Sequence, residues 1–496
     1  MRHPRYRSRR PCWAATIGTP ATRSRPPPSS PTGWPDTSRT RRNTMTDARG
    51  IAALAQGYAQ GSLDPVEVAS QALDQARAPG MDAVFITLLE ARALDEARAS
   101  QARWREGRPL GPLDGVPLAW KDLFDMAGTV TTCASDTRRQ AAPADDDAPA
   151  VRALAAAGMV SVGKTNLSEF AFSGLGINLH FGTPPNPYDA VVPRIPGGSS
   201  SGSAVAVARQ VVPCAMGTDT SGSIRVPAAL NGLVGWKPSS ARYDQRGVFP
   251  LAPSLDSIGP LVQTVADACL IDDALLGRAP TLRTGADLPA ARLVIPSGIL
   301  MSELEPGVAA AFEDTAERLA RRGFIVERRA VPVLDLTHHL FATFGTLVGV
   351  EAAAVHRELL DDPAALARVD ARIVQRLRLG QALPAQNRQA LRDNRPLLVA
   401  AMAAALAPGE ALLFPTVPMA APPIAALAAD PAWFAQCNAR VLRNTMVGSY
   451  LDMPTLALPC GTDGAGLPAG MSLAMATGRD EALLALGLAV ERELAA

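Results

Sequence analysis

Histidine is scarce in this chain. Among 496 residues there are five, namely His3, His180, His338, His339 and His356. A Ser-His-Asp triad or a zinc site would have to be built around His180, the one histidine beside a glycine-rich region, and its sequence neighbours support neither. We therefore expect catalysis that does not use histidine.

Cysteine is sparse as well. The chain has no CxxC pair, and no histidine follows or precedes a cysteine at the sequence spacing of a metal site. Free thiols of this kind are usually buried, and we expect them to be inert. The six cysteines are Cys12, Cys133, Cys214, Cys269, Cys437 and Cys460.

Long apolar runs and net charge are also lacking. The longest apolar run ends at Pro408 after about a dozen residues, which is too short to span a bilayer. No secretory apolar segment occurs near the start, and the formal net charge is +1. We expect a soluble, cytoplasmic protein that binds neither membranes nor nucleic acid.

The first 44 residues differ in composition from the rest. They hold ten arginines and one acidic residue, Asp36, and show no apolar periodicity. Their arginine content superficially resembles an organellar transit peptide. We expect residues 1–44 to be a disordered tail or a mis-assigned gene start, because an enzyme-like sequence begins at Met45.

From residue 45 onward, apolar segments of strand length alternate with helical repeats. This alternation is typical of α/β proteins. We expect a large mixed, mostly parallel β-sheet, covered by helices on both faces, with ligands bound at the carboxyl ends of its strands. Helices are predicted at 63–78, 89–107, 147–158 and 202–210, and strands at 113–121, 159–165 and 211–219.

The pattern divides residues 45–496 into three parts. A core at about 110–265 is followed by a mainly helical insertion at about 300–407, and strands with a final helix return at about 410–496. Ser302 and Glu305 are spaced as a capping box, which predicts a helix start there. The insertion is a candidate for shaping a substrate pocket.

Three stretches carry candidate chemistry. Lys121 ends an apolar strand, "IPGGSSSGSAVAVARQ" at 195–210 is a serine-glycine turn that leads into a helix, and "GTDTSGSIR" at 217–225 places Ser223 at a strand-to-helix turn. Unpaired backbone N–H groups gather at such a turn, where they could stabilise an oxyanion. A serine nucleophile needs a base, and with histidine scarce the available base is a lysine.

Burial beside Trp120 would lower the pKa of Lys121 towards neutrality. Asp122 would oppose this if its carboxylate faced the ammonium. Adjacent strand residues face opposite ways, so we expect Asp122 to point away from Lys121.

Together these stretches resemble the amidase signature family of Ser-Ser-Lys hydrolases. The motifs occur in the order "DGVPLAWKD", "VGKTNLSEFAF", "GGSSSGSAVAVA" and "GTDTSGSIRVPAALNGLVGWKPS", and the similarity continues through "GVFPLAPSLDSIGPLVQTVADA" to "GLPAGMSLAM". It covers nearly everything after residue 45 except the helical middle. The resemblance implies the amidase signature fold and an amidohydrolase that needs no metal or organic cofactor.

The resemblance also implies roles for individual residues. Ser223 matches the acylated nucleophile, Lys121 the base, and Ser199 a bridging serine that follows a cis peptide bond. A hydroxyl at Ser199 could both accept and donate a proton between the other two. The matching oxyanion-hole amides are those of Thr220, Ser221, Gly222 and Ser223.

One position departs from the family pattern, since Ser221 stands where a glycine is common. The donor is a backbone N–H, so we expect a serine to be tolerated there. In supporting roles, we expect Ser200 to form a hydrogen bond near Lys121 and Asp219 to pair with Arg225. Three residues that could line a pocket, Phe170, Phe172 and His180, are expected in the core instead.

The sequence therefore predicts hydrolysis of a small-molecule carboxylic amide through a serine acyl-enzyme, with release of ammonia or an amine. Two alternatives remain open. One is the A-type glutaminase subunit of a tRNA-dependent amidotransferase, and the other is a non-catalytic binding protein on the same scaffold. Homodimers are common among similar proteins, so a homodimer is also open. The sequence does not identify the amide.

Overall fold

The computed structural model describes residues 50–283 and 291–495. The predicted tail at 1–44 lies outside these residues. Local sequence signals explain several helix starts. The α2 helix, for example, begins with Pro65 directly after Asp64, whose carboxylate accepts a hydrogen bond from the N–H of Val66.

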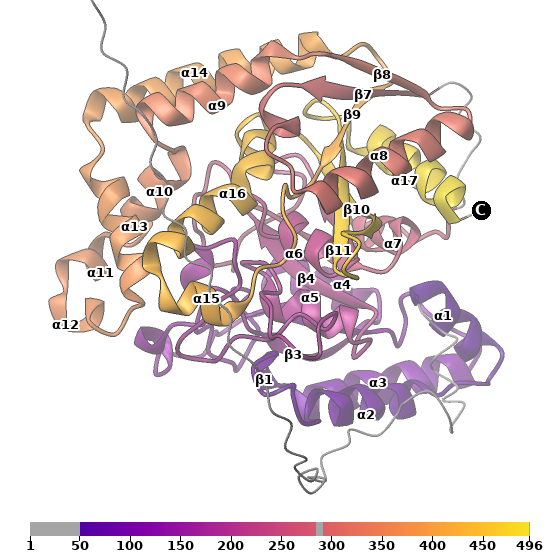
Figure 1. Ribbon diagram of the computed structural model, residues 1–496. Coiled ribbons are helices and arrows are strands. Elements are labelled where there is room, and N and C mark those ends of the chain that lie inside the picture. Colours follow the sequence, from indigo (N-terminus) through magenta and orange to yellow (C-terminus); the bar gives the residue numbers. More distant parts are fainter. Residues whose placement is uncertain (1–49, 284–290, 496) are drawn as a thin grey trace, which may run out of the picture. The chain divides into compact units, whose positions relative to one another are not determined.

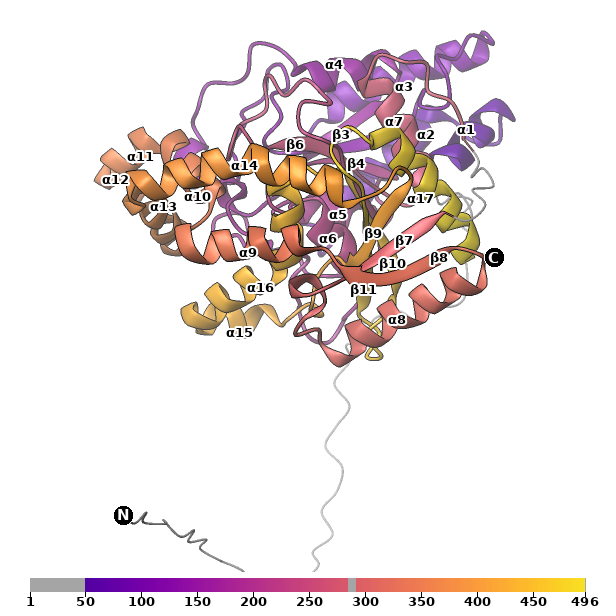
Figure 2. The same cartoon turned by 90° about the horizontal axis from the view of Figure 1, so that it is seen from above.

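The described residues contain an eleven-stranded mixed sheet in the order β1-β3-β2-β4-β6-β5-β10-β11-β9-β7-β8 (Figures 1 and 2). The strands are β1 (Phe85–Leu88), β2 (Pro117–Lys121), β3 (Val160–Thr165), β4 (Cys214–Asp219), β5 (Val234–Lys237), β6 (Ser257–Val262), β7 (Arg292–Ser297), β8 (Ile325–Ala330), β9 (Glu410–Pro415), β10 (Thr455–Thr462) and β11 (Pro468–Ala474).

The expected α/β class with a mixed sheet is confirmed, but the expectation of mostly parallel strands is wrong. Four neighbouring pairs are parallel, namely β2 with β3 and β4, and β7 with β8 and β9. The other six pairs are antiparallel. A helical connection between two neighbouring strands predicts that these strands are parallel. Helix α6 and strand β5 separate β4 from β6 in sequence, yet β4 and β6 pair antiparallel.

Helices cover both faces of the sheet, as expected. Ala457 and Leu456 are neighbours on β10 and so point to opposite faces. Gly235, which lies opposite Ala457, packs against Ala228 of α6 (Arg225–Leu230). Leu456 packs against Gly487 of α17 (Asp480–Ala495) on the other face.

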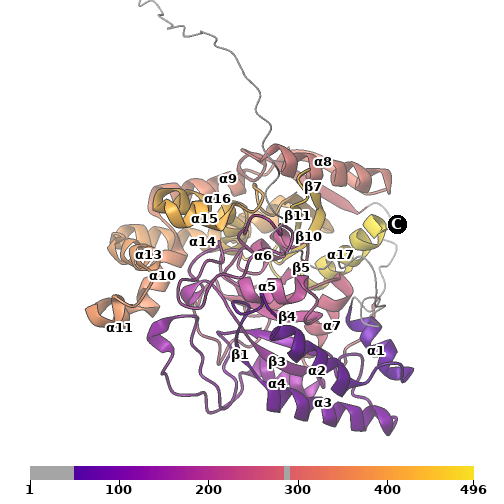
Figure 3. The ribbon, with the colours of Figure 1, turned by 60° about the horizontal axis from the view of Figure 1, so that its bottom comes forward.

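The remaining helices of the core and the C-terminal part surround this sheet. Helix α3 packs on β3 and against α2, at the β1 end of the sheet (Figure 3). Helix α5 packs on β2 and β4 and carries the serine loop at its start. The bounds are α1 (Ile51–Ala59), α2 (Pro65–Ala76), α3 (Glu90–Arg105), α4 (Pro149–Ala156), α5 (Ser201–Ala208), α7 (Val265–Leu275), α15 (Ile424–Ala429) and α16 (Pro431–Tyr450).

The middle of the chain is mainly helical, as predicted. Helices α9 and α14 of this part lie side by side (Figures 1 and 2). The helices are α8 (Pro306–Arg321), α9 (Pro332–Phe344), α10 (Leu347–Val355), α11 (Arg357–Asp361), α12 (Pro363–Leu366), α13 (Ala371–Ala382) and α14 (Ala385–Ala405). Among the described residues, no single helix has the length and apolar composition of a membrane span, and α9 and α10 meet that test only as a pair bent by 51°.

The predicted capping box at the start of α8 is wrong. The hydroxyl of Ser302 donates to the carbonyl of Ile299, and the carboxylate of Glu305 accepts from the N–H of Ala420. Glu305 itself is the N-cap residue, and its side chain makes no capping bond. A local bond to Ile299 engages the Ser302 side chain, and a long-range bond from Ala420 engages the Glu305 side chain, so neither is free to cap the helix.

Candidate active site

Lys121 lies at the carboxyl end of β2, a fully buried strand between β3 and β4. Its side chain has no exposed surface. The Nζ atom donates to the hydroxyl of Ser199 at 2.6 Å and to the hydroxyl of Thr218 at 2.8 Å. Two hydroxyls from different elements thus hold the ammonium or amine in one place.

The environment lowers the pKa of Lys121 to about 7. Burial is the main cause, because the charged form loses its hydration. The negative charges of Asp219 and Asp256 act in the opposite direction but do not outweigh burial. A substantial neutral fraction is therefore present near neutral pH.

Asp122 does not contact Lys121, as expected, although it too is buried. Its carboxylate lies 2.7 Å from the Nζ of Lys164 on β3, and both side chains are fully buried. It also accepts from the N–H of Thr132 at 3.0 Å. The carboxylate next to Lys121 in sequence is thus neutralised by another lysine.

The loop that holds Ser199 is tightly packed. The peptide bond between Gly198 and Ser199 is cis, as the resemblance implied. The N–H of Gly198 donates to the carbonyl of Gly174 at 2.8 Å, and the carbonyl of Ser199 accepts from the N–H of Ser168 at 3.1 Å. A Cβ atom at Gly198 would lie 2.5 Å from the backbone nitrogen of Gly176, so only glycine fits there.

Ser200 contributes to the same cluster, but it does not bond to Lys121 directly. Its hydroxyl donates to the carbonyl of Thr218 at 3.4 Å, and the Thr218 side chain contacts the lysine. Its N–H donates to the carbonyl of Ser223 at 3.3 Å. Ser200 therefore connects the serine loop to both β4 and the turn after it.

The turn after β4 carries Ser223 and is organised by Asp219. The Asp219 carboxylate accepts from the N–H groups of Gly222 at 2.7 Å and Ile224 at 3.2 Å. It also forms the expected ion pair with Arg225, at 2.8 Å, and both side chains are fully buried. Burial raises the pKa of Asp219, but Arg225 outweighs it and the pKa falls to about 2.

Four amides were expected to form the oxyanion hole, and the turn makes three of them available. Within residues 50–283 and 291–495, the N–H groups of Thr220, Ser221 and Ser223 have no hydrogen-bond acceptor. The N–H of Gly222 is occupied by Asp219, so its expected availability is wrong. The physical reason is that Asp219 caps the turn that presents the other amides.

The hydroxyl of Ser223 makes no hydrogen bond to any described residue. The backbone of Ser223 is nevertheless fixed to the serine loop through Ser200. The structure therefore brings Lys121 and Ser199 into contact and leaves the Ser223 hydroxyl without a hydrogen-bond partner among the described residues. Catalytic hydrogen bonds often tighten only when substrate is bound.

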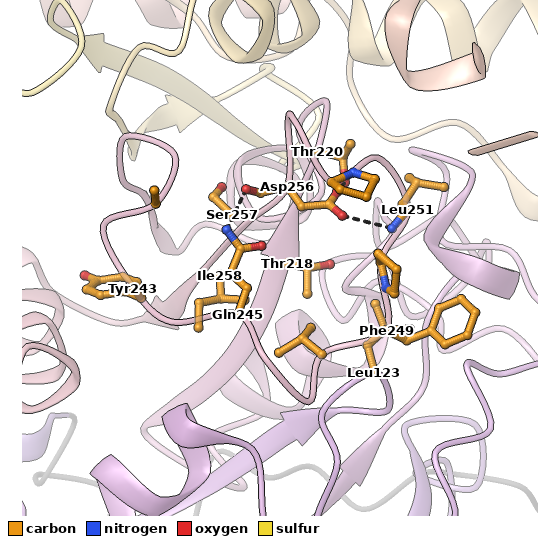
Figure 4. A pocket seen from close by; sticks show the side chains of 14 residues that line it. Leu123, Thr218, Thr220, Tyr243, Gln245, Phe249, Leu251, Asp256, Ser257 and Ile258 are labelled. Atoms are coloured by element: carbon orange, nitrogen blue, oxygen red, sulfur yellow. Dashed lines mark hydrogen bonds between the residues drawn. The ribbon is translucent and has the colours of Figure 1, made fainter. Parts of the chain in front are cut away.

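A cavity of about 460 Å³ adjoins this cluster (Figure 4). Thr218 and Thr220 line it on the side of the turn, and Phe249 and Gln245 come from the loop before β6. At its wall, the buried carboxylate of Asp256 accepts from the Thr220 hydroxyl at 2.5 Å and from the N–H of Leu251 at 2.9 Å. Burial raises the pKa of Asp256.

Other predicted features lie away from the lysine and serines. The five described cysteines are buried free thiols, as expected. Phe170 and Phe172 belong to the hydrophobic core, also as expected, whereas His180 is partly exposed and lies 3.3 Å from Glu169. Over the described ranges, no group of three or more His, Cys, Asp or Glu residues is arranged to hold a metal ion.

Comparison with protein families decides the class of this chain. The Amidase family model matches residues 67–484. The chain belongs to the amidase signature family. Membership of this hydrolase family accounts for the order of the motifs along the chain.

Relatives and solved structures agree with this assignment. The chain is 32% identical to 2-amino-5-chloromuconic acid deaminase of Comamonas testosteroni, over 91% of this chain and 94% of the relative. It is 35% identical to the A subunit of glutamyl-tRNA(Gln) amidotransferase from Myxococcus xanthus (strain DK1622), over 82% and 89%. A crystal structure of an amidase superposes with a TM-score of 0.79 at 31% identity, over 89% of this chain and 99% of that one.

Sequence reasoning missed two residues of this site. Thr218 carries the second hydroxyl on Lys121, and Asp256 fixes the Thr220 side chain. The position of Thr218 could have indicated its role, because it lies one residue before Asp219 at the carboxyl end of β4, the strand that pairs with β2. Asp256 is 36 residues from Thr220 in sequence, so no local pattern predicts their contact.

Proposed function

We propose that this amidase-family chain hydrolyses a carboxylic amide, with Ser223 as nucleophile, Ser199 as proton relay and Lys121 as base. The observation that carries the proposal is the 2.6 Å contact between the Lys121 Nζ atom and the Ser199 hydroxyl inside a buried site. A neutral lysine there accepts a proton from a serine hydroxyl, which an exposed, charged lysine cannot do.

In the acylation step, the Ser223 oxygen attacks the carbonyl carbon of the amide. Its proton passes to Ser199, and the Ser199 proton passes to Lys121, so the tetrahedral intermediate forms beside a lysine ammonium. The same protons then return through Ser199 to the amide nitrogen. The carbon–nitrogen bond breaks, ammonia or an amine leaves, and an ester on Ser223 remains.

Deacylation repeats the sequence with water as the nucleophile. Water attacks the ester carbonyl and gives a proton to the relay, and the relay then protonates the Ser223 oxygen as the ester bond breaks. The carboxylic acid leaves and the free enzyme is restored. These steps consume one water molecule and need no metal or organic cofactor.

The amides of Thr220, Ser221 and Ser223 are the proposed oxyanion donors. Each lacks an acceptor within the part of the chain that the structure describes, and the buried Asp219–Arg225 pair holds the turn that presents them. Donors fixed before the reaction stabilise the developing charge without reorganisation. One such donor typically contributes about 10²- to 10³-fold in rate.

The cavity beside Thr218 and Thr220 is proposed to receive part of the substrate. Its apolar side chains, such as Phe249, favour an uncharged group. The Asp256 carboxylate at its wall is already engaged by hydrogen bonds from Thr220 and the backbone. The cavity therefore offers little to a charged group.

The experiment that tests the proposal measures ammonia release from a panel of primary amides. We expect Lys121→Ala to lower kcat/KM by about 10²- to 10⁴-fold, the usual contribution of a general base, and Ser223→Ala to abolish turnover. Ser302→Ala, which removes a hydroxyl bonded only to a backbone carbonyl, serves as a matched control. Near-normal activity of folded Lys121→Ala protein would contradict the proposal.

A second candidate is a glutaminase subunit of a tRNA-dependent amidotransferase. The 35% identity to the A subunit of such an enzyme supports it. It predicts that glutamine is the preferred amide and that turnover requires partner proteins. Efficient hydrolysis of other amides by the isolated chain would exclude this candidate.

A further inference from the structure

Gln245 presents a free hydrogen-bond acceptor to the cavity beside Thr218. The residue lies in the loop before β6, and its side chain forms part of the cavity wall (Figure 4). Its Nε2 atom donates to the backbone carbonyl of Asp256 at 2.9 Å. Among the described residues, none donates a hydrogen bond to its Oε1 atom. The amide of Gln245 is therefore bonded through its nitrogen and open at its oxygen.

The orientation of this amide follows from its partner. A backbone carbonyl can only accept a hydrogen bond, so the NH2 group of Gln245 must face the carbonyl of Asp256. The side-chain oxygen then faces away from that carbonyl, and in Figure 4 it turns to the side of Thr218, among the side chains that line the cavity. The free atom is thus an acceptor and not a donor.

The other polar side chains of the cavity wall are already engaged. Asp256 accepts with both carboxylate oxygens, from the Thr220 hydroxyl at 2.5 Å and from the N–H of Leu251 at 2.9 Å. Apolar side chains such as Phe249 form the rest of the wall. Within the part of the chain that the structure describes, Oε1 of Gln245 is the one polar side-chain atom of this wall without a hydrogen bond. The engaged side chains are Thr218, Thr220, Tyr243, Asp256 and Ser257.

The loop that carries Gln245 is held on both sides of this residue. Before it, the Tyr243 hydroxyl accepts from the Nε1 atom of Trp236 at 3.0 Å. After it, the N–H of Phe249 donates to the carbonyl of Leu123 at 2.8 Å. A group that is fixed before the substrate binds loses little conformational freedom on binding. The free oxygen of Gln245 is therefore suited to discriminate between substrates.

We infer that Gln245 selects amide substrates that carry, apart from the amide that is cleaved, an uncharged N–H or O–H group. This inference rests on the proposed amidase function and on the cavity as part of the substrate site. One such donor satisfies the free oxygen. A charged ammonium would lose its hydration against the apolar wall, and a carboxylate would bring only further acceptors to an acceptor.

The test uses primary amides whose far end carries an acetamido group, over a series of chain lengths, and isosteric ketones in which CH2 replaces the N–H. Ammonia release reports cleavage of the primary amide alone. We expect kcat/KM at the best length to be about three- to tenfold higher for the acetamido member, the usual contribution of one hydrogen bond. Gln245→Met keeps the length of the side chain and removes the acceptor, so it should abolish this preference.

The preference separates this role from a structural one. A change that only disturbs the loop would lower kcat/KM equally for both members, whereas loss of the acceptor lowers it selectively for the acetamido member, mainly through KM. The matched control is Gln389→Met, at an exposed glutamine of α14 whose side chain bonds to Asp393, and it should keep the preference. Equal hydrolysis of both members at every length, or a preference that survives in Gln245→Met, would overturn the inference.

A binding measurement gives a readout without turnover. Calorimetry of the same two compounds on the Ser223→Ala protein should show about three- to tenfold tighter binding of the acetamido member. The added Gln245→Met change should make the two affinities equal. Equal affinities in Ser223→Ala itself, or no binding of either compound, would also overturn the inference.

Failure of the proposed function is distinguishable from failure of this inference. If a fluorophosphonate labels Ser223 and both members are hydrolysed equally well, only the role of Gln245 is wrong. If Ser223 is not labelled and no amide is hydrolysed, the proposed hydrolysis is wrong, and the calorimetric comparison alone then decides the role of Gln245.

Discussion

Protein atoms surround the Nζ atom of Lys121 on all sides, and this single fact sets the chemistry expected of it. A lysine in water has a pKa near 10.5, whereas burial lowers the pKa of Lys121 to about 7. Ser199 and Thr218 accept its hydrogen bonds but bring no negative charge. The side chain is therefore suited to exchange protons near neutral pH.

The pH dependence of the rate follows from this shift. Only neutral Lys121 accepts a proton, and its neutral fraction falls tenfold per pH unit below the pKa. We therefore expect log kcat/KM to rise with a slope of about one up to about pH 7 and to level off above it. A series of initial rates from pH 5 to 9 measures this. A flat profile from pH 6 to 9, or one still rising at pH 9, would contradict a buried lysine base.

Ser221 and Gly222 are adjacent, but the structure has room for a side chain only at Ser221. The Ser221 hydroxyl is buried without a partner, and the proposed function uses only its backbone N–H. Gly222 has a φ of +139°, and a Cβ atom there would lie 2.2 Å from the Thr445 hydroxyl oxygen. A side chain therefore would not fit at Gly222, where the chain retains glycine.

We expect Gly222→Ala to lower kcat/KM by more than tenfold, because the turn must shift and the amides move with it. Ser221→Ala, the matched change at the adjacent residue, should cost much less, since the backbone N–H remains. Steady-state kinetics with thermal unfolding of both variants measures this. A larger loss in Ser221→Ala than in Gly222→Ala would show that the Ser221 hydroxyl, rather than the turn geometry, matters.

At the scale of the structural elements, one buried ion pair holds the turn between β4 and α6. Asp219 caps N–H groups of the turn and pairs with Arg225, and the Arg225 guanidinium also donates to the Ser449 hydroxyl on α16 at 2.6 Å. Neither side chain of the pair is exposed. This pair therefore connects the sheet, the turn and α16.

Removing one partner leaves the other charge buried and unpaired. We expect Asp219→Asn to lower the free energy of unfolding by about 3 to 5 kcal/mol, as for other broken buried pairs. Urea unfolding measures the loss. The exposed pair of Arg98 with Asp95 provides the control, since Asp95→Asn should change stability by less than about 1 kcal/mol. Similar small effects of both changes would mean that the Asp219 pair does not hold the turn.

At the scale of the whole molecule, the site combines segments that are far apart in the chain. Lys121 lies at the end of β2, Ser199 lies in the serine loop, and Ser223 lies in the turn after β4. The loop before β6 contributes to the cavity. No single segment could form this arrangement alone.

The cavity offers a test of how these segments work together. Val248 lines it from the loop before β6 and is only partly buried, so a larger residue there can project into the space. We expect Val248→Trp to lower kcat/KM at least tenfold for bulky amides and much less for the smallest ones. Val191→Trp, at a position 88% exposed, is the matched control. Equal effects on large and small amides would exclude the cavity as part of the substrate site.

The sequence predicted the elements that local patterns encode. The strands and helices around Lys121 and Ser199, the helical middle and the Asp219–Arg225 pair were all expected, because apolar periodicity and motif spacing report on them directly. The largely antiparallel pairing of β5, β6, β10 and β11 was not expected, since strand direction depends on connections that periodicity does not describe.

Long-range contacts were also beyond the sequence patterns. Thr218 and Asp256 gain significance only from what surrounds them in space. The same holds for the Gly222 amide, which was expected to be free and instead bonds to Asp219. Burial and hydrogen-bond partners, which decide the pKa of Lys121, are properties of the folded chain.

The measurement that tests the central claim most directly is covalent labelling of Ser223 by a fluorophosphonate, followed by intact mass. An activated serine should gain one phosphonyl group per chain without any knowledge of the substrate, and Ser223→Ala should gain none. Lys121→Ala should react far more slowly at neutral pH. Labelling that persists in Ser223→Ala, or no labelling of folded wild-type protein, would contradict the assignment of Ser223 as the nucleophile.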